Sequence, residues 1–258
     1  MILGFSAGLA AVLVVVAFLS GIGITAVGPG GIFLTVALFA LTSVTPATVV
    51  GTASATFVAT GLLGTLTYVR SGELSSSSGW RLATVLSVTG IVGALLGVRL
   101  NGILPTELFG VLLGVFVSAT GVLIWWRTRT TAEATLDPTT VRGVAVASVL
   151  GLFVGTAGGL LGVGGPVLTV PLLVATGIPL LAALGAAQVQ SVFIAGFATA
   201  GYFVQDAISL ELAVLVGVPE LVGVVVGWRV AHMVDETRLK RVLAVVLVVV
   251  GPYLALSG

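Results

Sequence analysis

The first 69 residues of the chain contain no Asp, Glu, Lys or Arg. At about 1.5 Å per residue, a single helix of that length would extend about 100 Å. A bilayer core is only about 30 Å thick, so the segment must fold back at least twice if it enters a membrane. Helix-breaking residues indicate where, at Gly28-Pro29-Gly30-Gly31 and at Thr45-Pro46. We therefore predict helices near Leu3–Val27, Ile32–Leu41 and Ala47–Val69.

The composition places the whole chain in a membrane. Of its 258 residues, 58% are hydrophobic and only 7% are charged, whereas a soluble domain carries about 25% charged residues. We therefore expect an all-α, multi-pass integral protein of the cell membrane. No basic residue precedes the first apolar run, so we expect a first transmembrane helix there rather than a cleaved signal peptide. The net charge of +1 gives no reason to expect a nucleic-acid partner.

Few residues are available for catalysis or metal binding. The chain has no cysteine, which excludes disulfides, thiolate metal sites and thiol catalysis. Its one histidine, His232, cannot form a histidine-rich metal site. The chain has no phosphate-binding loop of the ATPase type, and Lys240 is its only lysine. We therefore expect no metal, no cofactor and no enzyme activity.

The chain is internally duplicated. Residues of the first half recur about 134 positions later, and further along the chain the offset falls to about 130. The matching pairs include Gly21/Gly155, Gly28/Gly162, Gly30/Gly164, Gly31/Gly165, Tyr68/Tyr202, Gly93/Gly223, Gly97/Gly227 and Arg99/Arg229. The second half has corresponding breaks at 162–166 and 177–179. Many duplicated transporter folds bind their ligand between the repeats.

Two further helices are expected in each half. They are Leu82–Val98 and Leu108–Trp126 in the first half, and Leu212–Trp228 and Leu239–Leu256 in the second. We divide the chain into a first transmembrane repeat at 1–126, a cytoplasmic linker at 127–142 and a second transmembrane repeat at 143–258. Each repeat then has about five helical segments.

Lys and Arg in short loops mark the cytoplasmic side of a membrane protein. The loop Arg229–Arg241, the linker and the loop between Arg70 and Arg81 are therefore expected to be cytoplasmic. The equivalent of that last loop, Gln205–Glu211, has no Lys or Arg and is expected outside. Equivalent loops on opposite sides require an odd number of crossings per repeat, which means an inverted repeat. The parity is the same for about ten spanning helices and for about six spans plus two re-entrant hairpins, so both remain open.

The paired Gly-rich breaks are a candidate anion site. Unwound backbone inside a bilayer is tolerated only where it is buried in protein or lines a cavity. A helix that starts after such a break points its N–H groups and positive dipole end into that cavity. Gly30 and Gly31 in the first half, with Gly164 and Gly165 in the second, would then bind an anion with backbone alone. The structural alternative is close helix packing through small residues.

Uncharged polar residues follow each break on the third helix of each half. The candidate ligands are Thr52, Ser54, Thr56, Gln188, Gln190 and Ser191. Their hydroxyls and amides can donate hydrogen bonds to anionic oxygens without the cost of a buried charge. The alternative is that they bond to their own helix or to a neighbouring one.

Glu220 is the one charged residue placed in the middle of a predicted span, Leu212–Trp228. A charged carboxylate at a helix centre costs about 2.5–3.5 kcal/mol on insertion scales, so such residues are usually functional or paired. We expect Glu220 to be a coupling residue that carries a proton. Its repeat mate is Gly90, so this role would belong to one half only. The alternative is a protonated Glu that bonds a neighbouring helix or an oligomer contact.

Three features together resemble the sulfite exporter TauE/SafE family over nearly the whole chain. They are the Gly-rich break followed by a Thr-Val-Pro run (Gly164 to Pro171), the polar third helix, and the Gly-x-x-x-Gly-x-Arg helix (Gly223 to Arg229). The resemblance implies a secondary transporter that exports a small sulfur-containing anion, such as sulfite or an organosulfonate. Alternating access between the inverted repeats is the expected mechanism.

A passive small-anion channel is the alternative function. Saturable counterflow would distinguish the two, because a channel shows no trans-stimulation. The expected partners are a small anionic substrate and the lipid bilayer, and a homo-oligomer is compatible with the sequence.

Overall fold

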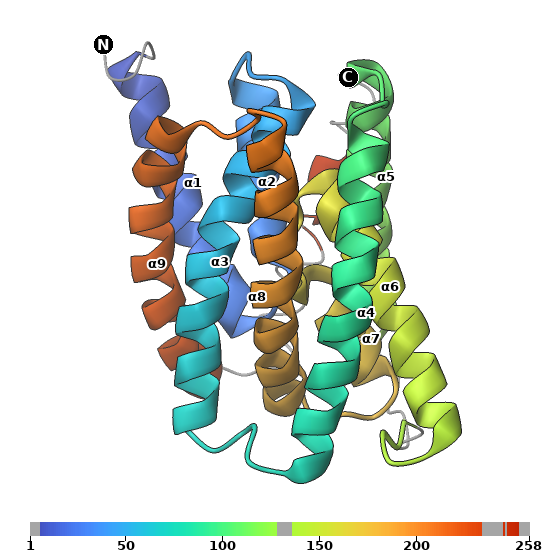
Figure 1. The fold of residues 1–258 in the computed structure, drawn as a ribbon. Helices are drawn as coiled ribbons and strands as arrows, with labels where there is room; N and C mark the ends of the chain where they lie inside the picture. Colours follow the sequence, from blue (N-terminus) through green and yellow to red (C-terminus); the bar gives the residue numbers. More distant parts are fainter. Residues whose placement is uncertain (1–5, 128–135, 234–244, 246, 253–258) are drawn as a thin grey trace.

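The computed structural model describes residues 6–127, 136–233, 245 and 247–252, and the elements within them are helices (Figure 1). Seven of these helices are long and apolar enough to cross a membrane. The described helices are α1 (Ala7–Ala26), α2 (Gly31–Leu41), α3 (Pro46–Arg70), α4 (Ser77–Asn101), α5 (Thr106–Arg127), α6 (Val141–Leu161), α7 (Pro166–Ala175), α8 (Leu180–Val204) and α9 (Leu210–Met233). The all-α, multi-pass membrane fold expected from the sequence is confirmed. The helix expected at Leu239–Leu256 lies largely outside the described residues.

The two short helices decide between the two topologies left open by the sequence. α2 has 11 residues and α7 has 10, so each is about 15 Å long and covers about half of a bilayer core. α2 packs back against α1, and α7 packs against α6 and α8. Each Gly-rich pair is therefore a re-entrant hairpin, named here the first hairpin (α1 and α2) and the second hairpin (α6 and α7).

Equivalent helices of the two halves pack equivalently. α1 lies against α9, and their repeat mates α6 and α4 lie against each other. A Cβ built on Gly21 would come within 2.0 Å of the carbonyl oxygen of Glu220, and one on Gly155 within 2.2 Å of that of Gly90. These four residues are also repeat mates. Backbones can approach this closely only where one residue has no side chain, so these glycines serve helix packing.

The central pair, α3 and α8, runs antiparallel. Gly51 near the start of α3 lies against Ala207 just past the end of α8, whereas Gly64 near the end of α3 lies against Gln188 near the start of α8. Figure 1 shows the same opposite directions for these two helices at the middle of the bundle. Antiparallel mates are what an inverted repeat requires.

The loops expected to be cytoplasmic meet at one end of the bundle, the lower end in Figure 1. A ring nitrogen of His232, at the end of α9, lies 2.8 Å from a carboxylate oxygen of Glu73, between α3 and α4. Ser76, Ser78 and Gly79, at the start of α4, line a pocket together with Asp137 of the linker. At the opposite end, Gly102 lies near Gln205 in the loop that lacks Lys and Arg. The assignment of the lower end to the cytoplasm stays a prediction from the loop charges.

Candidate functional site

The two Gly-rich breaks meet at the centre of the molecule. Gly28 and its repeat mate Gly162 have φ angles of +107° and +63°, which side chains disfavour, and both turn the chain at the tip of a hairpin. A Cβ on Gly28 would come within 2.7 Å of the Val170 side chain in α7. The hydroxyl of Thr35 in α2 donates a hydrogen bond to the carbonyl of Gly162. The broken helices thus lie at the interface of the two repeats, as expected.

The helices that follow the breaks, like α8 with its N-cap Pro179, have no side-chain cap at their N-termini, whereas α1, α3, α4 and α6 do. Side-chain oxygens of Ser6, Thr45, Ser76 and Thr140 cap α1, α3, α4 and α6. The N-cap residues of α2 and α7 are Gly30 and Gly165, and neither helix has a side-chain cap. The first N–H groups of a helix need an acceptor, and the helix dipole favours a negative one. Two such ends beside one cavity are a candidate anion site.

A small cavity lies between these two helix starts. It has a volume of about 10 Å³, which is room for about one water molecule. It is lined by Ile24, Gly28, Gly31, Phe57, Thr60, Val163, Gly164, Pro166, Val167 and Ser191. No charged side chain is part of this lining. The hairpins are therefore closed on each other, and an anion larger than water fits only if they separate.

The structure brings part of the expected site together. Gly31, Gly164 and Ser191 line the cavity. Gly165 lies directly behind, since a Cβ on it would be 3.1 Å from the Cα of Ser191. The Ser191 hydroxyl forms no hydrogen bond within the described residues, which leaves its proton for a ligand. Gly30 adjoins the cavity as the N-cap residue of α2.

The three hydroxyl residues expected on α3 lie outside the cavity lining. Thr52 accepts a hydrogen bond of 3.0 Å from the backbone N–H of Ser209, before α9. Thr56 donates to the carbonyl of Ala53 at 2.9 Å. Ser54 is buried in α3. In this closed structure these side chains serve the helices around the cavity.

The two glutamines join helices beside the cavity. Gln188 donates from Nε2 to the carbonyl of Ile24 at 3.2 Å, and its Oε1 has no partner within the described residues. Gln190 accepts from the Thr169 hydroxyl at 2.5 Å and donates to the carbonyl of Leu86 at 3.4 Å. Both side chains are fully buried. Gln188 holds the end of α1 at the cavity wall, whereas Gln190 ties α8 to α7 and α4.

Three further residues near the cavity or the first break were not predicted from the sequence. Phe57 and Thr60 line the cavity from α3, and Thr60 lies one turn after Thr56, so helical spacing could have found it. Ser20 contacts both Gly30 and Glu220. Its repeat mate is Val154, so the duplication offered no signal for Ser20.

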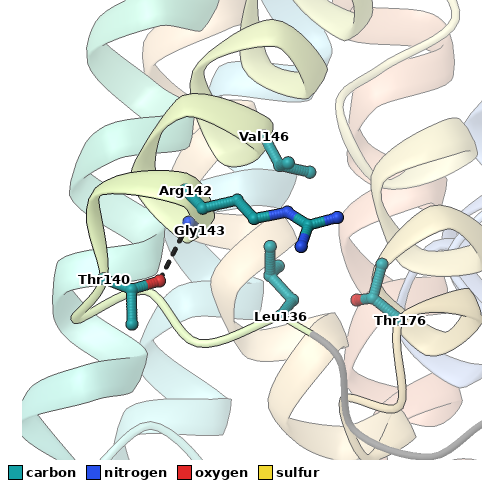
Figure 2. A pocket seen from close by; sticks show the side chains of 6 residues that line it. All are labelled: Leu136, Thr140, Arg142, Gly143, Val146 and Thr176. Atoms are coloured by element: carbon teal, nitrogen blue, oxygen red, sulfur yellow. Dashed lines mark hydrogen bonds between the residues drawn. The ribbon is translucent and has the colours of Figure 1, made fainter.

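A larger hollow opens at the end where the basic loops meet. It has a volume of about 400 Å³ and is lined by Leu136, Thr140, Arg142, Gly143, Val146 and Thr176. Figure 2 shows the guanidinium of Arg142 extending from the start of α6 across the hollow toward Thr176, at the end of α7. From the sequence, Arg142 was only a marker of the cytoplasmic side. The structure places its charge in a hollow beside the end of α7, the second arm of the second hairpin.

The model of the sulfite exporter TauE/SafE family matches residues 11–254, which is nearly the whole chain. The chain belongs to the TauE/SafE family. The resemblance seen in the Gly-rich breaks and the Gly-x-x-x-Gly-x-Arg helix is thereby confirmed.

Curated proteins that are similar in sequence to this TauE/SafE protein are named as membrane transporters. A "Probable membrane transporter protein" of Xylella fastidiosa (strain 9a5c) is 25% identical over 230 residues, which cover 88% of this chain and 87% of the relative. The "Probable membrane transporter protein YdhB" of Bacillus subtilis (strain 168) is 24% identical over 242 residues, which cover 93% of this chain and 97% of the relative. No solved structure gave a significant match. This TauE/SafE protein is a multi-pass membrane transporter and not an enzyme.

Proposed function

We propose that this protein is a secondary transporter that exports a small sulfur-containing anion, such as sulfite or an organosulfonate. The observation that carries the proposal is the pair of uncapped helix starts, whose first residues Gly31 and Pro166 line one closed cavity. The family description names sulfite export, and that description supports the sulfur-containing substrate class.

The chemistry of the cavity suits an oxyanion. Backbone N–H groups at two helix starts and the hydroxyl of Ser191 can donate hydrogen bonds to its oxygens. The Thr60 hydroxyl lies in the lining and donates to the carbonyl of Phe57 at 3.3 Å, a bond weak enough to exchange for an anion. Because no cationic side chain lines the cavity, binding would be moderate and the anion could leave again.

The two hairpins support alternating access as the mechanism of this proposal. The first hairpin and the second hairpin enter the bundle from opposite ends, and their tips close the same cavity. Movement of one hairpin would open the cavity to one side, while the other hairpin keeps the opposite side shut. The Arg142 hollow lies at the end of the bundle that is predicted to be cytoplasmic, where a positive charge raises the local concentration of anions.

Counterflow in proteoliposomes tests this proposal against a passive anion channel. We expect radiolabelled sulfite to accumulate transiently in vesicles preloaded with unlabelled sulfite, and the rate to saturate. Conductance that does not saturate and shows no trans-stimulation would establish the channel instead. Organosulfonates, thiosulfate and sulfate as competitors would define the substrate class.

A matched pair of serine variants tests whether the anion binds at Ser191. Ser191→Ala should raise the KM for sulfite about tenfold, because a hydrogen bond to a charged group contributes about 1.5 kcal/mol. Ser148→Ala is the control, since its hydroxyl bonds only the carbonyl of Val144 in its own helix at 2.8 Å. Equal KM values for the two variants would remove Ser191 from the site.

A further inference from the structure

Glu220 is fully buried at the centre of α9, where α9 packs against α1. Its Oε1 lies 3.1 Å from the hydroxyl of Ser20 in α1. The same hydroxyl lies 3.1 Å from the carbonyl oxygen of Gly30, the N-cap residue of α2. Ser20 therefore stands between the carboxyl and the tip of the first hairpin.

The proton count of this group restricts its charge. A serine hydroxyl has one proton to donate, yet Ser20 lies between two acceptors if Glu220 is ionised. Both contacts are hydrogen bonds at once only if the carboxyl is protonated and donates to Ser20, which then donates to Gly30. The Thr56 hydroxyl also faces the carboxyl but donates to the carbonyl of Ala53 at 2.9 Å.

The second carboxyl oxygen supports the same reading. Oε2 of Glu220 has no hydrogen-bond partner within the described residues. An ionised carboxylate with one oxygen unpaired in a dry interior is strongly unfavourable, whereas a neutral acid tolerates it far better. The arrangement fits Glu220 in its neutral form.

We propose that a proton on Glu220 holds the first hairpin closed by acting through Ser20 on the carbonyl of Gly30. When the carboxyl O–H bond breaks and its proton passes to water, the ionised carboxylate accepts the one hydrogen bond that the Ser20 hydroxyl can donate. Gly30 then loses this bond and keeps only the backbone N–H of Phe33, at 3.0 Å, as a donor. The first hairpin is thereby released. This proposal rests on the proposed function, because a hairpin must move for the cavity to open.

The equivalent place in the second half lacks such a group. The repeat mates of Glu220 and Ser20 are Gly90 and Val154, neither of which can exchange a proton. The space beside Gly90 is filled by the Ile194 side chain, 3.0 Å from a Cβ built on Gly90, and by the amide of Gln190, whose Nε2 is 3.5 Å away. Proton control therefore belongs to the first hairpin alone.

Other titratable groups on the neighbouring helices lie away from Glu220. α1 has no acidic or basic residue between Ala7 and Ala26. α3 contributes Tyr68, which donates to the carbonyl of Thr25, and Arg70 at its end. α9 itself carries Glu211 near its start, with Arg229 and His232 near its end. No ion pair to Glu220 is formed within the described part of the chain.

Thiol labelling tests the proposal without any substrate. Because the chain has no cysteine, a single introduced thiol is a unique reporter. Ala26→Cys reports on the first hairpin and Ala157→Cys on the second, and both positions are buried near hairpin tips. The ratio of their labelling rates cancels the pH dependence of the reagent. As the pH rises from mildly acidic to alkaline, we expect this ratio to rise about tenfold, which corresponds to about 1.4 kcal/mol.

Two variants test the role of the Glu220 proton and the role of the Ser20 hydroxyl separately. Glu220→Gln keeps a donor toward Ser20, so the ratio should stay low at every pH. Ser20→Ala removes the relay, so the ratio should be high even at mildly acidic pH. A pH-dependent ratio that persists in Glu220→Gln would overturn the proposal, as would a low ratio at acidic pH in Ser20→Ala.

Infrared difference spectroscopy provides a second measurement if Ser20→Ala does not fold. We expect the wild-type protein to show a protonated-carboxyl band at neutral pH that Glu220→Gln lacks. A neutral-pH spectrum without this band would refute the proton on Glu220. Both measurements are independent of transport, so a failure to transport sulfite would count against the proposed function and leave this proposal standing.

Discussion

Tyr68 and Tyr202 occupy equivalent positions in the two repeats and make equivalent hydrogen bonds. The hydroxyl of Tyr68 donates to the carbonyl of Thr25, and the hydroxyl of Tyr202 donates to the carbonyl of Gly159 at 2.7 Å. Both acceptors lie in the last turn of the first helix of their half, where carbonyls lack partners within the helix. The third helix thus fixes the end of the first helix beside each hairpin tip.

Removing either phenol hydroxyl should destabilise the protein by a similar amount. We expect Tyr68→Phe and Tyr202→Phe each to lower the free energy of unfolding by about 1 kcal/mol, because each leaves a buried carbonyl without its donor. Thermal unfolding in detergent measures this. Thr156→Val is the control, since its exposed hydroxyl bonds only the carbonyl of Leu152 in its own helix. A loss confined to one tyrosine would show that the two bonds are not equivalent.

A methyl group on Gly30 should disrupt the first hairpin. A Cβ at this position would come within 2.3 Å of the Gly23 backbone and 2.4 Å of the carbonyl oxygen of Ser20. We expect Gly30→Ala to cost about 1–3 kcal/mol, as overpacking does. Gly196→Ala in α8 is the matched control, because nothing lies within 4 Å of its added Cβ. Equal melting temperatures for the two variants would contradict the close approach of α1 and the break.

The charge in the hollow of Figure 2 should act on anion capture. We expect Arg142→Gln to raise the KM for anion taken up from that end about fivefold at low salt, since a surface charge contributes about 1 kcal/mol there. The difference from wild type should shrink as salt screens the charge. Arg99→Gln, at the opposite end of the bundle, should leave this KM unchanged. A KM difference that is independent of ionic strength would argue against an electrostatic role.

The contact between Glu73 and His232 should give a small pH-dependent stabilisation. Burial raises the pKa of the Glu73 carboxyl, but hydrogen bonds from Ser71 and His232 outweigh it and hold the pKa below its ordinary value. A carboxyl with a lowered pKa stabilises the fold above its ordinary pKa, and this stabilisation is lost as the pH falls through the lowered value.

Glu73→Gln should therefore lower the stability at neutral pH by no more than about 1 kcal/mol, because the pair is partly exposed. In acid, the stabilities of the variant and the wild type should converge. Melting curves across the acidic range measure this, and a constant gap between the two proteins would be the contrary result.

Much of the secondary structure could be predicted from the sequence because its signals are local. Breaks at Gly28 and Gly162 are visible as Gly and Pro clusters, and the helices begin and end within a few residues of the expected positions, apart from α4 and α9, which extend further. The length of α2 was also predicted, at Ile32–Leu41. The sequence did not show that so short a helix forms a hairpin that turns back at the centre. Only the packing of α2 against α1 shows this.

The candidate site was predicted in part, for a physical reason. Gly31, Gly164 and Ser191 line the cavity because the breaks themselves form it. Thr52 and Gln190 are equally polar and buried, yet Thr52 bonds to Ser209 and Gln190 bonds to Leu86. The rotation of each helix about its axis decides which neighbouring helix such a side chain meets. Periodicity identifies residues that share a face of one helix, but it does not identify the helix that the face meets.

The sequence alone determined the membrane class, the duplication and the places where helices break, because residue types and their spacing along the chain are enough to reveal all three. Only the tertiary structure decided which polar groups share a proton. Ser20 and Glu220 are separated by 200 positions, and one hydroxyl joins them to Gly30. Their meeting depends on the close contact of α1 with α9, which packing at Gly21 allows.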